Sequence, residues 1–341
     1  MKNIFTPDKT EKFSSLVSAS SRVAVIAHTN PDGDAIGAGL ALTLFLSQKF
    51  GSSNPKFDVR FIVPNRFPAF LNWVDPDGKI DIFIDSCKYN ESFLAAADLI
   101  IIVDFNDVRR LEAMGAALDL NIAAPRILID HHIAPPLYDL MFHSTESSST
   151  AFLVYSLIES LGGGFTPAIA KALYLGMMTD TGSFAFGNLT ADLFRAVATL
   201  VENGLDVPAV NRSVYNTQSE DRVRMQGYLL SEKMEVRLAH HAAYITLTSD
   251  EKLRFNHQIG DTEGFVNIPL TIQGVEFSAM LIQTKECVKL SLRSVGELDV
   301  NIIARAHFNG GGHKNAAGGK FFGTMDEAIA TLEAVIADLK F

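Results

Sequence analysis

The sequence has little cysteine and no excess of positive charge. Among 341 residues there are two cysteines, Cys87 and Cys287, which lie far apart and outside any C-x-x-C pair. This excludes a disulfide framework and a thiolate zinc site. Lysine and arginine total 29 against 39 aspartates and glutamates, so the net charge is −10. We therefore do not expect a general binder of long or duplex nucleic acid, whereas a small anion held by a local basic cluster or by bound cations is compatible with this charge.

Long hydrophobic runs are also absent. Apolar stretches such as 95–103 are too short to span a bilayer. The first thirteen residues, MKNIFTPDKTEKF, contain no apolar segment of the kind found in a secretion signal. Together with the scarce cysteines, this predicts a cytoplasmic protein without a membrane segment.

What the sequence does contain is a strand and helix alternation typical of a parallel α/β sheet. Stretches with helical spacing, notably 35–48 and 108–118, lie between short apolar runs that are rich in β-branched residues. These runs are the predicted strands 23–27, 57–63, 99–103 and 127–129. Since open α/β sheets bind ligands beyond the carboxyl ends of their strands, the polar residues that follow these runs are candidate site residues.

The second half of the chain predicts helices and then a second mixed domain. Helical spacing dominates 148–234, and 222–237 is predicted to be a linker helix, although a continuation of the first core is an equally good interpretation. From 242 onward strands and helices alternate again. The predicted architecture is α/β, with an N-terminal parallel-sheet domain joined by a helical linker to a smaller C-terminal α/β domain. The predicted boundaries are 1–215, 216–240 and 241–341.

The first strand is followed by HTNPDGDAIGAGLAL, in which His28, Asp32 and Asp34 share one loop. Carboxylates and an imidazole without cysteine suit Mn²⁺ or Mg²⁺. For this motif alone the alternative is equally good, namely that Asp32 and Gly33 form a turn and that Asp34 caps the next helix.

Three more segments place ligand-type side chains where they can join this loop. Asp104 follows the strand 99–103, Asp130, His131 and His132 end or follow the strand 127–129, and Asp180 lies in GMMTDTGSF. Taken singly, each aspartate could be a helix cap and each histidine a core residue. Taken together, the carboxylates would repel one another unless cations neutralised them, which predicts a two-metal site.

These segments resemble the four motifs of the DHH phosphoesterase superfamily, in the right order over the first two thirds of the chain. The later GGGHKNAAGG resembles the glycine-rich signature of the DHH-associated substrate domain. The compact two-domain form is similar to the nanoRNase and pAp-phosphatase group, where pAp is 3′-phosphoadenosine 5′-phosphate.

The resemblance implies two Mn²⁺ ions bridged by Asp104, with Mg²⁺ or Co²⁺ as substitutes. It assigns His28, Asp32 and Asp104 to one ion and Asp34, Asp104, His131 and Asp180 to the other. The implied catalytic residues are Asp104, His132 near the scissile phosphate, and Asp130, which would orient the histidines. One departure is Phe105, because similar enzymes commonly carry Thr or Ser after the bridging aspartate. This departure puts the expected contact beside Asp104 in doubt, but not the role of Asp104 as a ligand.

The implied substrate-binding residues are basic side chains and glycines. Arg110 lies where relatives often carry an arginine, although a solvated helix face is the alternative. In GGGHKNAAGG the backbone can approach a phosphate closely, and Arg293 can add a bidentate contact, although a flexible loop and a surface charge would explain the same residues. The members of this second set are Gly311, Gly312, His313, Lys314 and Arg293.

The predicted function is Mn²⁺-dependent hydrolysis of short oligoribonucleotides, of pAp, or of both, by two-metal activation of water. The alternatives are a soluble phosphodiesterase for cyclic or linear dinucleotides, a pyrophosphatase, and a non-catalytic metal-containing nucleotide-binding protein, which only Phe105 favours. The expected partners are short oligonucleotides, dinucleotides or pAp. The sequence leaves the oligomeric state open, a homodimer included.

Overall fold

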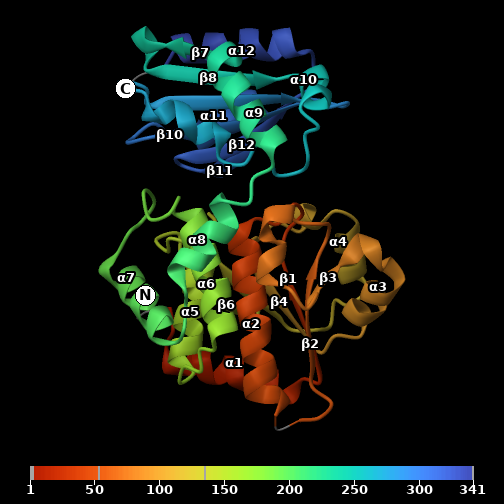
Figure 1. Ribbon diagram of the computed structural model, residues 1–341. Coiled ribbons are helices and arrows are strands. Elements are labelled where there is room, and N and C mark those ends of the chain that lie inside the picture. The colour runs from red at the N-terminus through yellow and green to blue at the C-terminus, as the bar shows by residue number, and fades with distance from the viewer. Residues whose placement is uncertain (1–3, 53, 134–135, 340–341) are drawn as a thin grey trace. The chain divides into compact units, whose positions relative to one another are not determined.

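The computed structural model describes residues 4–52, 54–133 and 136–339, and it divides the chain into two compact units, Met1–Thr217 and Gln218–Phe341 (Figure 1). Both units are α/β. In the part of the chain that is described, no helix has the length and apolar character needed to cross a membrane.

The first unit is built on six parallel strands in the order β3-β2-β1-β4-β5-β6. They are β1 (Arg22–Ile26), β2 (Asp58–Val63), β3 (Ile80–Ile82), β4 (Leu99–Val103), β5 (Arg126–Asp130) and β6 (Leu140–His143). The four predicted strands are confirmed, and the two edge strands β3 and β6 were missed because three or four residues give no clear pattern. The strand order reverses between β1 and β4, which is where open α/β sheets bind ligands.

Helices cover both faces of this sheet. The apolar residues of each central strand alternate between two cores, so Val23 and Val25 join one and Ala24 and Ile26 the other. Helices α1 (Pro7–Ala19), α2 (Gly33–Gly51), α5 (Thr150–Ser160), α6 (Pro167–Asp180), α7 (Ala191–Glu202) and α8 (Val207–Tyr215) contribute to the first core. Helices α3 (Cys87–Ala95) and α4 (Ala113–Asp119) contribute to the second.

The predicted helix 108–118 is wrong as a single element. A 3-10 turn, η3 (Val108–Leu111), is capped by the Asp107 side chain and is followed by Glu112, whose φ is +50°. This backbone conformation interrupts the helix, which restarts as α4 at Ala113.

Close packing of α2 against α6 brings distant acidic residues together. A Cβ atom at Gly37 would collide with the backbone of Ala172 and Gly176, so α6 reaches this distance only because α2 has glycine there. Figure 1 shows α2 alongside α5 and α6. This packing carries Asp34, in the first turn of α2, toward Asp180, the last residue of α6.

The second unit is a mixed six-stranded sheet in the order β11-β12-β10-β9-β8-β7, in which only β8 and β9 are parallel. Its strands are β7 (Met234–Arg237), β8 (Ala242–Leu247), β9 (Phe277–Gln283), β10 (Val288–Ser294), β11 (Gly311–His313) and β12 (Ala316–Phe321). Helices α11 (Val300–His307) and α12 (Met325–Ala337) pack on one face, and α9 (Glu220–Tyr228) with the 3-10 segment η6 (Phe265–Thr271) on the other. The short helix α10 (Ser249–Arg254) follows β8.

The predicted helix over 222–237 is wrong after Tyr228. Helix α9 ends at Tyr228, a π-helical turn follows over Leu229–Lys233, and Met234 begins strand β7. Met225 and Leu229 are fully buried against the strands of the second unit. The segment therefore packs as part of the second unit. Residues 234–237 form a strand despite their helical spacing, because they pair with β8.

Candidate metal centre

The acidic and imidazole side chains singled out in the first unit lie at the carboxyl edge of its sheet, where the strand order reverses. His28 follows β1, Asp104 follows β4, and Asp130 ends β5 with His131 and His132 after it. Three groups that include Asp104 have ligand atoms within 4.8 Å of one another, namely His28 with Asp32, Asp34 with His131, and Asp130 with His132. We call His28, Asp32 and Asp104 cluster A. We call Asp34, Asp104, His131 and the adjacent Asp180 cluster B.

The two oxygens of Asp104 face different clusters. Its Oδ2 atom lies 3.5 Å from His28 Nε2, whose distance to Asp32 Oδ2 is 4.0 Å. Its Oδ1 atom lies 3.7 Å from His131 Nε2, which is also 3.8 Å from Asp34 Oδ2 and 3.5 Å from Asp180 Oδ2. Asp104 is 2% exposed and its φ of +64° is unusual for a residue with a side chain. One buried carboxylate therefore joins both clusters.

The two histidines of these clusters have the hydrogen bonding that metal ligands need. The Nδ1 atom of His28 lies 2.8 Å from the Thr29 carbonyl oxygen, and that of His131 lies 3.3 Å from the Ser147 carbonyl oxygen. Because a carbonyl only accepts, each Nδ1 carries the proton and each Nε2 keeps a lone pair. The buried Nε2 atom of His28 makes no hydrogen bond to any described residue. It faces carboxylates, so the site fits a cation.

The pKa values of the carboxylates also fit a cation site. Burial, together with the charges of Asp104, Asp180 and Asp32, raises the pKa of Asp34 well above its usual range. Burial also raises the pKa of Asp180 to about 7, with repulsion from Asp104 adding to it and His131 opposing it. For Asp104 burial favours the neutral acid, but the contact with His28 and the charge of the neighbouring His132 hold its pKa well below its usual range. Bound cations would remove the need to protonate this cluster.

The alternative in which Asp34 caps α2 is wrong, because Asp32 is the residue that caps this helix. The Oδ1 atom of Asp32 caps the helix by accepting from the Asp34 and Ala35 amides at 3.0 and 3.1 Å, and Oδ2 faces His28. Asp34 accepts instead from the amides of Thr150 and Ala151, at 2.7 and 2.8 Å. Asp32 is thus both a cap and a candidate ligand.

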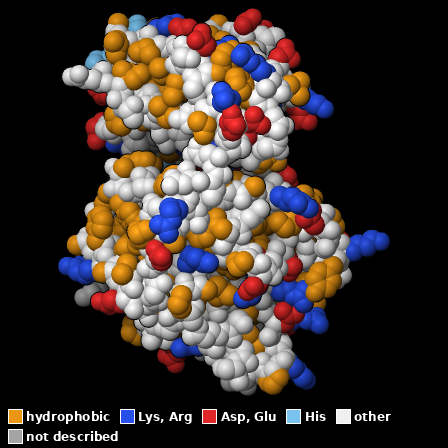
Figure 2. Space-filling model, in the orientation of Figure 1, with side chains coloured by type: hydrophobic (Ala, Val, Ile, Leu, Met, Phe, Trp, Pro, Cys, Tyr) orange, Lys and Arg blue, Asp and Glu red, His pale blue; other side chains and the backbone are white. Residues whose placement is uncertain are grey.

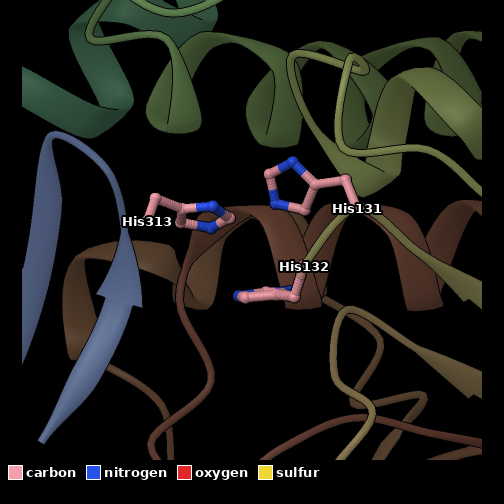
Figure 3. Close-up of side chains that lie close together, drawn as sticks. All are labelled: His131, His132 and His313. Atoms are coloured by element: carbon pink, nitrogen blue, oxygen red, sulfur yellow. The ribbon is translucent and has the colours of Figure 1, made fainter. Parts of the chain in front are cut away.

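Asp130 and His132 form a hydrogen-bonded pair beside the clusters. His132 Nδ1 lies 2.8 Å from Asp130 Oδ1, and Asn106 Nδ2 donates to the other oxygen of this fully buried aspartate at 2.8 Å. Burial alone would lower the pKa of His132, but the bond to Asp130 and the charge of Asp104 raise it to about 8. His131 and His132 leave adjacent positions, and their rings are 4.9 Å apart and nearly perpendicular (Figure 3). His132 therefore offers a positive charge near neutral pH.

Phe105 does not disturb this site. Its ring is fully buried in the core formed with α3 and α4. A hydroxyl reaches Asp104 from elsewhere, because Thr150 Oγ1 donates to Asp104 Oδ1 at 2.8 Å. Thr150 and Asn106 were not predicted from the sequence: the local signal for Thr150 is a run of serines before it, and Asn106 has no such signal.

Arg110 lies close to the same site. Its carbonyl oxygen accepts from the Thr29 amide at 2.7 Å, and its charge opposes protonation of His132. Within the described ranges, its guanidinium forms no hydrogen bond or ion pair, whereas Arg109 is bound to Asp107 at 2.6 Å. Arg110 is thus the arginine of this turn that can accept an anion.

In the second unit the glycine-rich segment is a β-hairpin, so its interpretation as a flexible loop was wrong. Strands β11 and β12 pair Gly311 with Gly318 and His313 with Ala316. Gly312 has a φ of +154°, and a Cβ atom there would collide with the Ala316 backbone. The Gly312 amide donates to Asn301 Oδ1 at 2.9 Å. Close packing of the two strands explains the glycines at 310 and 312.

The basic residues around this hairpin differ in their partners. Lys314 pairs with the exposed Glu297 at 2.7 Å, and Arg293 Nη1 donates to the Leu292 carbonyl at 3.0 Å. Arg305, which the sequence analysis missed, is held by Asn301 Oδ1 at 3.0 Å, and its guanidinium lies beside Gly311. No acidic residue of the described chain pairs with Arg305.

Comparison with known proteins supports the family resemblance. The DHH family N-terminal domain matches residues 22–177, and the DHHA1 domain matches 244–338. The bifunctional oligoribonuclease and PAP phosphatase NrnA of Thermus thermophilus is 28% identical over 327 residues, which are 93% of this chain and 90% of that protein.

Two solved structures extend this comparison. An exopolyphosphatase-related protein of Bacteroides fragilis is 37% identical, with a TM-score of 0.91 over 97% of this chain and 96% of the other. The Mn²⁺ complex of Thermus thermophilus RecJ shares the fold at 15% identity and a TM-score of 0.55, covering all of this chain and 55% of RecJ. With these matches and the buried His and Asp clusters, the chain belongs to the DHH family of metal-dependent phosphoesterases, with a DHHA1 domain in its second unit.

Proposed function

We propose that this protein hydrolyses pAp and short oligoribonucleotides and that it does so with two Mn²⁺ ions. The observation that carries the proposal is the buried carboxylate of Asp104, whose two oxygens face two separate groups of ligand-type atoms. A carboxylate placed in this way suits a bridge between two divalent ions.

The ligands follow from the two clusters. Cluster A would hold one ion, and cluster B the other, with Asp104 shared. Oxygen and imidazole donors without sulfur suit Mn²⁺, with Mg²⁺ and Co²⁺ as substitutes. When bound, such a pair of ions activates water and stabilises negative charge on the phosphoryl oxygens.

The side chains next to the clusters would bind and orient the phosphate. Asp130 holds Nδ1 of His132, which leaves the protonated Nε2 to donate to a phosphoryl oxygen. Arg110 adds a second cation, which forms no ion pair with any residue that the structure describes. Two cations beside a metal pair favour a dianionic phosphate over a neutral ligand.

Charge also supports a small substrate. On the face shown in Figure 2, Lys and Arg are interspersed with Asp and Glu and form no continuous basic track. The net charge of −10 points the same way. The similarity to NrnA, named an oligoribonuclease and PAP phosphatase, supports pAp and very short RNA as substrates.

In the second unit we propose that the hairpin β11–β12 binds an anionic group of the substrate. Our candidates are Arg293, His313 and the Gly311 and Gly312 backbone, and we add Arg305. Lys314 remains a candidate for this role. Because Lys314 is already paired with Glu297, Arg305 is better placed to bind an anion.

A second candidate function is hydrolysis of cyclic or linear dinucleotides, because the same metal pair would act on any phosphodiester. The non-catalytic alternative has lost its support, since Phe105 packs into the core and leaves the ligand atoms in place.

The test is a substrate panel with Mn²⁺, in which pAp, di- and trinucleotide RNA, cyclic dinucleotides and a long RNA strand are incubated with the purified protein and with the Asp104→Ala variant. Separation of products should show AMP and phosphate from pAp and mononucleotides from short RNA, with none from the variant. Turnover of cyclic dinucleotides alone would favour the second function, and no turnover by the wild-type protein would refute both.

A further inference from the structure

We propose that Thr150 is a positioning residue for one metal ion of the pair, that of cluster B, and that it sets the affinity of this ion separately from that of the ion of cluster A. This inference rests on the proposed two-metal function. It concerns the segment 147–151, which follows β6 and begins α5.

Three of the four cluster B ligands are bound by this segment. The Thr150 hydroxyl donates to Asp104 Oδ1 at 2.8 Å, and its amide donates to Asp34 Oδ2 at 2.7 Å. The Ala151 amide donates to the other oxygen of Asp34 at 2.8 Å. The Ser147 carbonyl accepts from His131 Nδ1. Thr150 therefore holds two carboxylates from different elements, namely Asp104, which follows β4, and Asp34, in the first turn of α2.

These contacts are strong because they are buried and charge-assisted. Thr150 is fully buried, and it is the first residue of α5, whose first amides have no partner within the helix. Ser149 caps the helix by accepting from the Phe152 amide, which leaves the amides of Thr150 and Ala151 for Asp34. The positive end of the helix therefore faces a carboxylate.

Cluster A is supported by a separate set of groups. The Thr29 carbonyl fixes His28, and Asn65 Oδ1 accepts from the Thr29 hydroxyl and the Asn30 amide at 3.0 and 2.6 Å. Asp32 is fixed by the amides of its own helix. No hydrogen bond of the described segment 147–151 reaches His28 or Asp32, so the two sets of supports meet at Asp104 and at the Asp34 amide, which donates to Asp32.

The hydroxyl of Thr150 acts on the oxygen of Asp104 that faces cluster B. It holds Oδ1 at 3.7 Å from His131 Nε2, while Oδ2 remains directed at His28. Without the hydroxyl, Oδ1 loses its fixed orientation toward the second ion. Loss of a group that orients a ligand typically weakens metal binding about 10- to 100-fold.

The experiment compares Thr150→Val, which keeps the shape and removes the donor, with Thr150→Ser, which keeps the donor. Mn²⁺ binding is followed by isothermal titration calorimetry and by electron paramagnetic resonance, where coupled ions are distinguished from a single ion. Wild-type protein should bind two Mn²⁺ ions. In Thr150→Val one step should weaken about 10- to 100-fold and the coupled signal should give way to that of a single ion, while Thr150→Ser stays near wild type.

Asn65→Ala is the matched control, because it removes a support of cluster A only. It should weaken a single step, and combining it with Thr150→Val should weaken both. Unchanged affinities in Thr150→Val, or equal weakening of both steps, would overturn the role of Thr150 while leaving the two-metal function intact. If the wild-type protein binds fewer than two ions, the proposed function fails, and this inference fails with it. Thermal unfolding of the metal-free variants separates a general loss of stability, which would weaken both steps, from the selective loss expected.

Discussion

Binding of Mn²⁺ should become tighter as the pH rises from 5.5 to 7.5, because the metal-free site holds protons that the ions must displace. Burial and repulsion raise the pKa of Asp180 to about 7 and that of Asp34 well above 3.8. A carboxylate with a pKa of about 7 is still mostly protonated at pH 6, and a metal ion binds only its ionised form. Affinity therefore rises with pH, whereas an aspartate with an ordinary pKa would contribute almost no slope in this range.

The magnitude follows from the pKa of Asp180. With a pKa of about 7, half of these side chains are ionised at pH 7 and about one in eleven at pH 6, so the apparent affinity falls about fivefold over that unit and nearly tenfold over the next. Asp34 adds to this slope. The same shifts make the metal-free fold less stable as the pH rises from about 4 to 7, since the folded chain then holds protons that the unfolded chain has released.

Calorimetric titration in two buffers of different ionisation enthalpy counts the protons released on metal binding at pH 6. We expect at least one proton, and Asp180→Asn should release about one fewer than the wild-type protein. The reasoning is refuted if affinity is constant between pH 5.5 and 7.5, or if Asp180→Asn releases as many protons as the wild-type protein. The melting temperature of the metal-free protein, measured between pH 4 and 7, gives a second test, because it should fall as the pH rises.

Three further predictions concern single residues. Asp104→Ala should lower the turnover of pAp by about 10³-fold or more, because both ions lose a ligand, and near wild-type activity with Mn²⁺ would contradict the bridge. His131→Ala should reduce the number of bound metal ions, whereas His132→Ala should keep them and lower the rate, and metal analysis of both variants tests this difference. Arg305→Ala should lower kcat/KM for pAp about 10- to 100-fold, with little effect on bis-p-nitrophenyl phosphate, which has no second anion. Lys314→Ala is the matched control with the smaller effect, and equal losses on both substrates would show that Arg305 supports the fold.

The sequence by itself determined the core of the first unit and the edge at which its polar residues gather. The runs that became β1, β4 and β5 are short and β-branched, and each is followed by a ligand-type residue, namely His28, Asp104 or His131. Carboxyl ends of neighbouring parallel strands share one edge, so local pattern was enough to predict that these residues meet.

Local pattern failed where pairing or packing with a distant segment decides the conformation. Residues 234–237 have helical spacing but form β7, because β8 offers hydrogen bonds that a helix end does not. The glycine run forms a hairpin because β11 pairs with β12 and the Gly312 amide donates to the Asn301 side chain. Phe105 is harmless for the same reason, since the direction of its side chain depends on the core beside α3 and α4.

Only the tertiary structure decided how the site residues divide their work. Asp32 and Asp34 are two residues apart and chemically identical, yet one caps its own helix and the other accepts from the start of α5. Thr150 lies 46 positions from the Asp104 carboxylate that it orients. Such partners follow from the packing of α2, α5 and α6 over the sheet, and the distance between two atoms in space is not encoded in the spacing of their residues along the chain.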